Sequence, residues 1–197
     1  MYKAGVLNLD DFLRLVDNIR CRRYPVKIKF GLEICYFEDF GKFIRDLTKD
    51  IKLDFLLGSV HFIENFAFDH KAEFWNGIDI DSAFRSYFER SINLARSGIF
   101  SGLAHPDCIK LFGHSPSFPL ENYYEKLAKA LSENNMYAEE SSGISRRCPE
   151  TATLGMNENM IRIMKKHDVK IITVSDAHHP NDVGDKISIM EDKLNNI

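Results

Sequence analysis

Short apolar runs alternate along the chain with longer stretches in which apolar residues recur every three or four positions. The short runs are typical of buried strands and the longer stretches of amphipathic helices, the first of which Asn8 could cap. The pattern predicts helices over residues 9–22, 39–50, 81–98, 120–135 and 157–168, and a last helical piece that runs to Ile197. This alternation favours βα units around a mainly parallel sheet.

The strands are predicted over residues 26–36, 53–63, 99–107, 136–143 and 169–179. A polar and aromatic section over 64–80 predicts a loop across one face, and the Pro- and Gly-rich section 111–119 predicts another. With about five βα cycles and no linker or repeat, we expect one domain over residues 1–197. Such units form either an open doubly wound sheet or a barrel, and the pattern does not separate the two.

The composition is that of an ordinary globular protein, with 44% hydrophobic and 28% charged residues. A formal net charge of −3 argues against a nucleic-acid partner, which usually requires clustered Lys and Arg. No apolar run approaches the roughly 18 residues of a membrane span, and the N-terminus lacks a signal-peptide pattern. The four scattered cysteines predict reduced thiols. We therefore expect a cytoplasmic protein with no membrane or nucleic-acid partner.

Residues of the metal-binding types recur where the predicted strands end. The five candidates are Glu33, His61, His105, Asp176 and His178. The carboxyl ends of parallel strands share one face of an α/β fold, so these side chains are expected to converge there. Each alone has an ordinary explanation as a turn residue, an ion pair or a helix cap. Together, carboxylates and imidazoles without thiolates are typical of hydrolytic zinc, manganese or iron sites.

The last candidates form an Asp-x-His pair. Asp176 and His178 are two residues apart, so in extended backbone both side chains point to the same side. His179 would point away, either toward substrate or a ligand or into solvent. The remaining histidines do not follow the strand-end pattern: His70, His114 and His167.

Two arginines follow the glycine-containing loop predicted after the strand 136–143. Arg146 and Arg147 are expected on the same face as the metal candidates. A guanidinium group can bind phosphate through two parallel hydrogen bonds. A solvated basic pair is the alternative, and neighbouring metals favour the phosphate interpretation.

Five segments of the sequence follow one another in an order known from one family. They are "GLE" with Glu33, "LLGSVHFI" with His61, "GLAHPD" with His105, "ESSGISRR", and "SDAHHPNDVG" with Asp176 and His178. In these segments the chain resembles the polymerase and histidinol phosphatase (PHP) family, and its histidinol-phosphatase branch in particular. The resemblance implies an α/β fold of the distorted (β/α)7 TIM-like barrel type. It also implies up to three divalent metal ions and the hydrolysis of a phosphate monoester.

The resemblance implies a role for each candidate ligand. Glu33 would bridge two metals, and His61 and His105 would complete the second metal site. Asp176 would serve the first metal and His178 the third.

The implied substrate is a small phosphate ester, L-histidinol phosphate of histidine biosynthesis. Arg146 or Arg147 would contact its phosphate. The ammonium and imidazole groups of such a substrate also need recognition, for which the acidic candidates are Glu64, Glu139 and Glu140.

The chain departs from the family pattern at its beginning. Family members open with an H-x-H strand, whereas this chain has no histidine before His61. We therefore predict an incomplete barrel that lacks the first two βα units and a closing strand after Ile197. Of the three metal sites that the resemblance implies, only the second would keep its full set of ligands. An incomplete barrel exposes a strand edge and apolar surface, which favours self-association or a complementing N-terminal fragment.

Three functions stay open from the sequence. The first, which we predict, is a histidinol-phosphatase-type phosphatase. The second is an inactive remnant or a partner-dependent metal-binding module. The third is a phosphoesterase acting on another small phosphate or on nucleic acid, and the acidic charge balance argues against nucleic acid.

Overall fold

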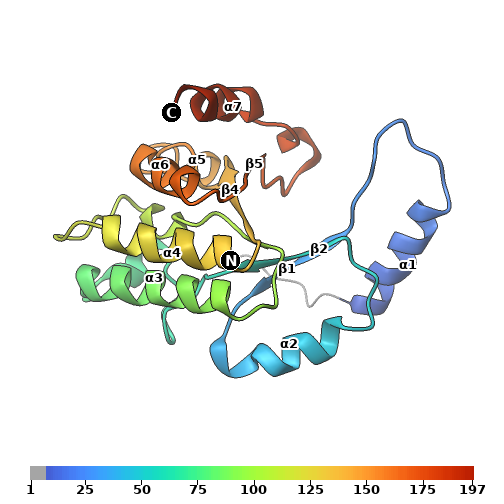
Figure 1. Cartoon of the computed structure of the whole chain (residues 1–197), viewed down its shortest axis with the longest axis horizontal. Coiled ribbons are helices and arrows are strands. Elements are labelled where there is room, and N and C mark those ends of the chain that lie inside the picture. The colour runs from blue at the N-terminus through green and yellow to red at the C-terminus, as the bar shows by residue number, and fades with distance from the viewer. Residues whose placement is uncertain (1–7) are drawn as a thin grey trace.

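The computed structural model describes residues 8–197 and contains a parallel sheet of five strands in the order β1-β2-β3-β4-β5 (Figure 1). The strands are β1 (Gly31–Cys35), β2 (Phe55–Ser59), β3 (Gly102–Leu103), β4 (Tyr137–Ser141) and β5 (Ile171–Val174). Each strand pairs with the next one along the chain. This sequential order differs from that of a doubly wound sheet, whose strand order reverses at a switch point. The predicted α/β class is confirmed.

Helices connect or flank these strands. They are α1 (Leu9–Arg20), α2 (Gly41–Thr48), α3 (Ile80–Arg96), α4 (Glu121–Glu133), α5 (Gly143–Arg147), α6 (Glu158–Lys166) and α7 (Ile187–Asn196). The side chains of Asn8, Asp79 and Asn157 accept hydrogen bonds from backbone N–H groups in the first turns of α1, α3 and α6, which fixes where these helices begin. The cap predicted at Asn8 is therefore confirmed. No helix in the described part of the chain is long and apolar enough to cross a membrane.

The strands are shorter than predicted, and this corrects the place of Glu33. The first strand begins only at Gly31, because the N–H of Phe30 donates to the Asp54 carboxylate (2.8 Å) instead of to a neighbouring strand. Glu33 consequently lies in the middle of β1 and not at its end. The third strand ends at Leu103 because the chain turns at His105, whose carbonyl accepts from the N–H of Cys108 (3.0 Å).

One face of the sheet packs on helices. The main hydrophobic core contains residues of α3, α4 and α6. The sheet contributes these side chains to it: Leu32, Ile34, Leu56, Leu103 and Ala138. Helix α3 packs on α4, and α4 on α6 (Figure 1). On the same face, Lys193 of α7 donates to the buried Glu140 of β4 (2.8 Å). This face therefore belongs to the core.

The opposite face carries two carboxylates, Glu33 of β1 and Glu139 of β4. The register pairs Glu33 with Leu57, Leu57 with Gly102, and Gly102 with Tyr137. Paired residues of parallel strands point to the same side, and side chains alternate along each strand. Glu139, two residues after Tyr137, therefore lies on the same face as Glu33. This face holds the candidate chemistry.

Candidate metal centre

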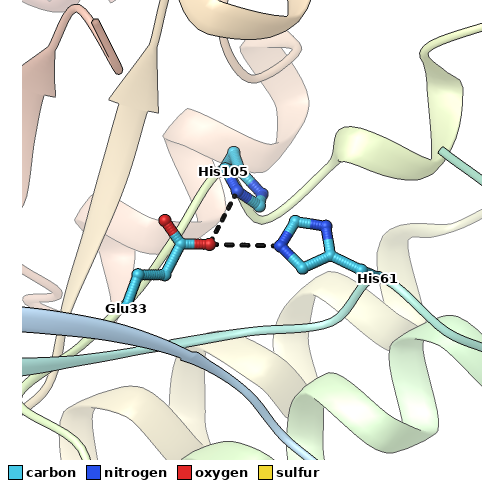
Figure 2. A group of neighbouring side chains, drawn as sticks. All are labelled: Glu33, His61 and His105. Carbon is cyan, nitrogen blue, oxygen red and sulfur yellow. Dashed lines mark hydrogen bonds and ion pairs between the residues drawn. The ribbon is translucent and has the colours of Figure 1, made fainter. Parts of the chain in front are cut away.

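Glu33, His61 and His105 converge over β1, β2 and β3 (Figure 2). The Oε1 atom of Glu33 lies 3.1 Å from Nε2 of His61 and 3.4 Å from Nε2 of His105. One ligand atom from each residue lies within 4.8 Å of the others. A carboxylate and two imidazoles at this spacing form a set of oxygen and nitrogen donors for one divalent cation.

The backbone brings these side chains in from different positions. Glu33 projects from the middle of β1, whereas His61 and His105 follow the last residues of β2 and β3. His105 has a φ of 28°, and the more distant candidate Asp176 has a φ of 48°. Residues other than glycine are uncommon in this left-handed region and cluster at functional sites, where the surrounding structure compensates for the strain.

The triad concentrates charge in a partly buried place. Burial alone would raise the pKa of Glu33, but hydrogen bonds with His105 and His61 hold it well below its usual range. Burial opposes the charged form of His61, yet its hydrogen bonds with Asp69 and Glu33 raise its pKa to about 9. The Nδ1 atom of His105 is buried and has no hydrogen-bond partner among the described residues. The site therefore favours positive charge next to Glu33.

A neighbour that the sequence did not indicate is Asp69. Its Oδ2 lies 2.9 Å from Nδ1 of His61, and its Oδ1 lies 2.9 Å from Nδ1 of His70. Burial would raise the pKa of Asp69, but the hydrogen bonds from both histidines lower it. The residue lies in the section 64–80, predicted only as a loop, and no periodicity marks it there. Its one sequence signal is the neighbouring candidate His61, eight residues earlier.

Asp176 and His178 lie apart from the triad. The Asp176 carboxylate occupies the space beside Gly143, where a Cβ atom would come within 2.1 Å of Oδ2. Burial raises the pKa of Asp176, while the charge of His105 lowers it and that of Glu33 raises it. His178 is largely exposed, and its Nδ1 lies 3.1 Å from the carbonyl oxygen of Asp176. His179 caps the short helical turn Pro180–Asp182 by accepting from the N–H of Asn181.

The two arginines differ in their contacts. Arg146 donates to the carbonyl oxygens of Ser175 (2.9 Å) and Asp176 (2.7 Å) and also pairs with two aspartates of the following loop. Arg147 is 44% exposed, lies 3.7 Å from Oδ2 of Asp69, and donates to the carbonyl of His70 (3.2 Å). Both belong to α5, a short helix where the sequence predicted a loop. Of the two, Arg147 has the guanidinium group with fewer contacts.

The three acidic residues considered for substrate recognition separate in space. Glu139 is buried on the face of the triad, and burial, with Glu33 and Asp176 nearby, raises its pKa to about 7. Glu140 points to the opposite face and pairs with Lys193. Glu64 is exposed in the loop after β2.

The family model for the PHP domain matches residues 4–142 of the chain. This chain belongs to the PHP family. The match includes the whole triad and ends within the segment that joins β4 to α5.

Relatives of this PHP domain include histidinol phosphatases. A "probable histidinol-phosphatase" of Deinococcus radiodurans is 27% identical over 160 residues, which cover 80% of this chain and 60% of the relative. The chain thus spans 60% of the length of this curated relative. The resemblance to the histidinol-phosphatase branch is confirmed.

Solved structures share the fold of this PHP domain. One is the histidinol phosphate phosphatase of Lactococcus lactis, complexed with zinc, L-histidinol and phosphate. It matches with a TM-score of 0.77 at 20% identity, and the match covers 95% of this chain and 72% of the Lactococcus chain. A second structure, from Listeria monocytogenes, has a TM-score of 0.76 at 13% identity, with coverages of 94% and 76%. At these identities the comparison supports a common fold.

The residues present in this PHP domain fit a divalent metal ion. The donor set of one carboxylate and two imidazoles matches the chemistry of such ions. A cation beside Glu33 would also take over the charge compensation that protonated His61 provides.

Proposed function

We propose that this PHP domain is a metal-dependent phosphatase that hydrolyses L-histidinol phosphate in histidine biosynthesis. The observation that carries the proposal is the triad of Glu33, His61 and His105 on the face of the sheet opposite the helices. Two comparisons support it: the similarity to a "probable histidinol-phosphatase", and a neighbour of the same fold that was solved with zinc, L-histidinol and phosphate.

The triad would hold one divalent ion, with zinc, manganese and iron all compatible with nitrogen and oxygen donors. When bound, the ion supplies Lewis-acid activation of the phosphate group and of a water molecule. Asp176 and His178 would serve further ions, as the resemblance to the family implies. Glu33 needs no rearrangement to act as a ligand, because its carboxylate already faces both imidazoles.

The surrounding side chains would bind and orient the substrate. Arg147 is partly exposed beside the triad, so its guanidinium would bind the phosphate. Arg146 would instead fix the loop that carries Asp176, because it already donates to the backbone there. Glu139 is buried on the same face and is our candidate for binding the ammonium group of histidinol phosphate, because a neighbouring positive charge would favour its ionised form.

We also propose that residues 1–197 form one domain, and that its sheet is part of a PHP-type distorted barrel. The sequential parallel order supports this, as do the half-buried side chains of Phe55, Tyr137 and Ile172 on the face opposite the helices. Within residues 8–197, β1 pairs with β2 alone, so its outer edge is open to another strand. A strand from a second copy or from a complementing fragment would pair there.

The test is a phosphatase assay on L-histidinol phosphate with zinc, manganese or iron, run beside elemental analysis. Loss of a hydrogen-bond partner of a metal ligand typically lowers activity up to about 100-fold. Glu33→Gln removes a ligand itself, so it should lower turnover by more than that. Glu125→Gln is the matched control, because Glu125 also contacts a histidine but lies on α4, where it bridges to α6. Absence of turnover with every metal, or full activity of Glu33→Gln, would contradict the proposal.

A metal-binding module without turnover is the second candidate function. It is favoured by the observation that Asp176 and His178 lie outside the triad. Tight binding of one metal ion without phosphatase activity would select this function.

A further inference from the structure

We propose that Asp69 is a positioning residue of the metal centre. Its carboxylate fixes the ring of His61 so that Nε2 faces Glu33 and the metal. The inference rests on the proposed function, because it takes the triad as a metal site, but it assigns a role to a residue outside the triad.

The His61 ring is engaged from both sides. Its Nδ1 lies 2.9 Å from Oδ2 of Asp69, and its Nε2 lies 3.1 Å from Oε1 of Glu33. A carboxylate that accepts from Nδ1–H leaves Nε2 as the nitrogen that offers its lone pair to a metal. Asp69 therefore selects both the orientation of the ring and the nitrogen that serves as the ligand.

Asp69 is itself held in place. Its side chain is 12% exposed, and its second oxygen lies 2.9 Å from Nδ1 of His70. The preceding residue, Phe68, is fully buried, and its carbonyl accepts from Nε1 of the buried Trp75 (2.8 Å). A carboxylate on such a fixed segment can orient a ligand, whereas a carboxylate on a freely moving loop cannot.

The same carboxylate connects the metal centre to the proposed phosphate-binding residue. Arg147 lies 3.7 Å from Oδ2 of Asp69 and donates to the carbonyl of His70. Asp69 thus sets the place of His61 and of Arg147 relative to one another. A purely structural role would predict a change in stability without a change at the metal.

The experiment measures binding of Zn²⁺ by calorimetry and the visible absorption spectrum of bound Co²⁺, both without substrate. Asp69→Ala should weaken Zn²⁺ binding about 10- to 100-fold, the usual effect of losing the partner of a ligating histidine. Asp69→Asn should lose less affinity, because the amide oxygen still accepts from His61. The Co²⁺ spectrum should change in both variants. In the matched control, Glu125→Gln, the lost carboxylate contacts His167 and Lys166 instead, so affinity and spectrum should equal those of the unmodified chain.

Wild-type affinity and an unchanged Co²⁺ spectrum in the Asp69 variants would overturn the inference. Asp69→Asn keeps the shape of the side chain, so it decides the matter should Asp69→Ala fail to fold. If the unmodified chain bound metal but did not hydrolyse the substrate, the proposed function would be contradicted and the role of Asp69 would stand. If the unmodified chain bound no metal, both would fail.

Discussion

At the scale of single residues, His61 carries a proton that a metal ion has to displace. Burial opposes this proton, but the hydrogen bonds with Asp69 and Glu33 raise the pKa of His61 to about 9. Below that pH, metal and proton compete for Nε2, so metal affinity should rise as the pH rises toward about 9. Calorimetry in buffers of different ionisation enthalpy should show proton release on binding. A constant affinity between about pH 6 and 8 would contradict this expectation.

Arg146 and Arg147 are adjacent in sequence but should respond differently to substitution. Arg147→Ala should raise KM for the phosphate ester about 10- to 100-fold, since a hydrogen bond to a charged group contributes about 1.5–3 kcal/mol. Arg146→Ala should instead lower the free energy of unfolding by about 2 kcal/mol, because two backbone carbonyls lose their donor. Urea unfolding and steady-state kinetics on both variants separate the effects. If Arg146→Ala raised KM and Arg147→Ala lowered the free energy of unfolding, Arg146 would be the residue that binds the phosphate.

The sequence predicted part of this site at residue level. His61, His105 and Glu33 were all predicted because each was expected where a strand ends. The two histidines do follow the ends of β2 and β3, whereas Glu33 lies within β1. Asp69 was not, because its approach to His61 depends on how the section 64–80 folds. The contacts of Arg146 could not be predicted either, because they are made to backbone carbonyl groups, which every residue has.

At the scale of elements, one ion pair ties α7 to the sheet. Lys193 of α7 donates to Glu140 of β4 (2.8 Å) and to the carbonyl of Leu154 (2.9 Å), and Glu140 is fully buried. Lys193→Met would leave the Glu140 carboxylate buried without a cation, at a cost of about 3 kcal/mol in the free energy of unfolding.

The matched variant for this prediction is Lys193→Met combined with Glu140→Gln. A neutral amide at position 140 can still accept from the N–H of Met156, as the carboxylate does (2.7 Å). The double variant should therefore recover much of the stability in urea unfolding. If both variants were equally unstable, packing of the lysine chain, and not charge, would be what matters.

Helices were predicted more closely than strands, for a physical reason. A helix such as α3 makes its hydrogen bonds within itself, so its periodicity is local. The extent of a strand depends on its neighbours: the predicted strand 99–107 pairs only over Gly102–Leu103. Helix α5 escaped prediction because five residues are too few to show a period.

At the scale of the whole molecule, the sequence predicted βα units but not their order in the sheet. The order follows from contacts between distant residues, such as Glu139 beside Ile172. The parallel pairing β1-β2-β3-β4-β5 brings His61 and His105 to one end of the sheet, although 44 positions separate them in sequence. The candidate metal centre is thus a property of the fold and not of any one segment.

Within residues 8–197, β1 has a paired strand on one side alone, and the segments before and after β1 in the sequence expose apolar side chains. Phe40, the residue before α2, and Phe43 and Leu47 within α2 are exposed, as are Val26 and Ile28 in the extended segment before β1. Phe40, Phe43 and Leu47 are three and four residues apart, so they lie on one side of the helix. An unpaired strand edge next to apolar surface favours association.

We therefore expect the chain to self-associate through this surface. The double variant Phe43→Lys and Leu47→Lys should shift it toward the monomer in sedimentation velocity. The matched control is Ile189→Lys on α7, an equally exposed apolar residue on a helix that lies at the opposite end of the view from α2 (Figure 1). Because the control changes charge and hydrophobicity in the same direction, it separates a specific surface from general solubility. A monomeric unmodified chain, or an equal effect of Ile189→Lys, would show that the surface near β1 does not bind a second copy.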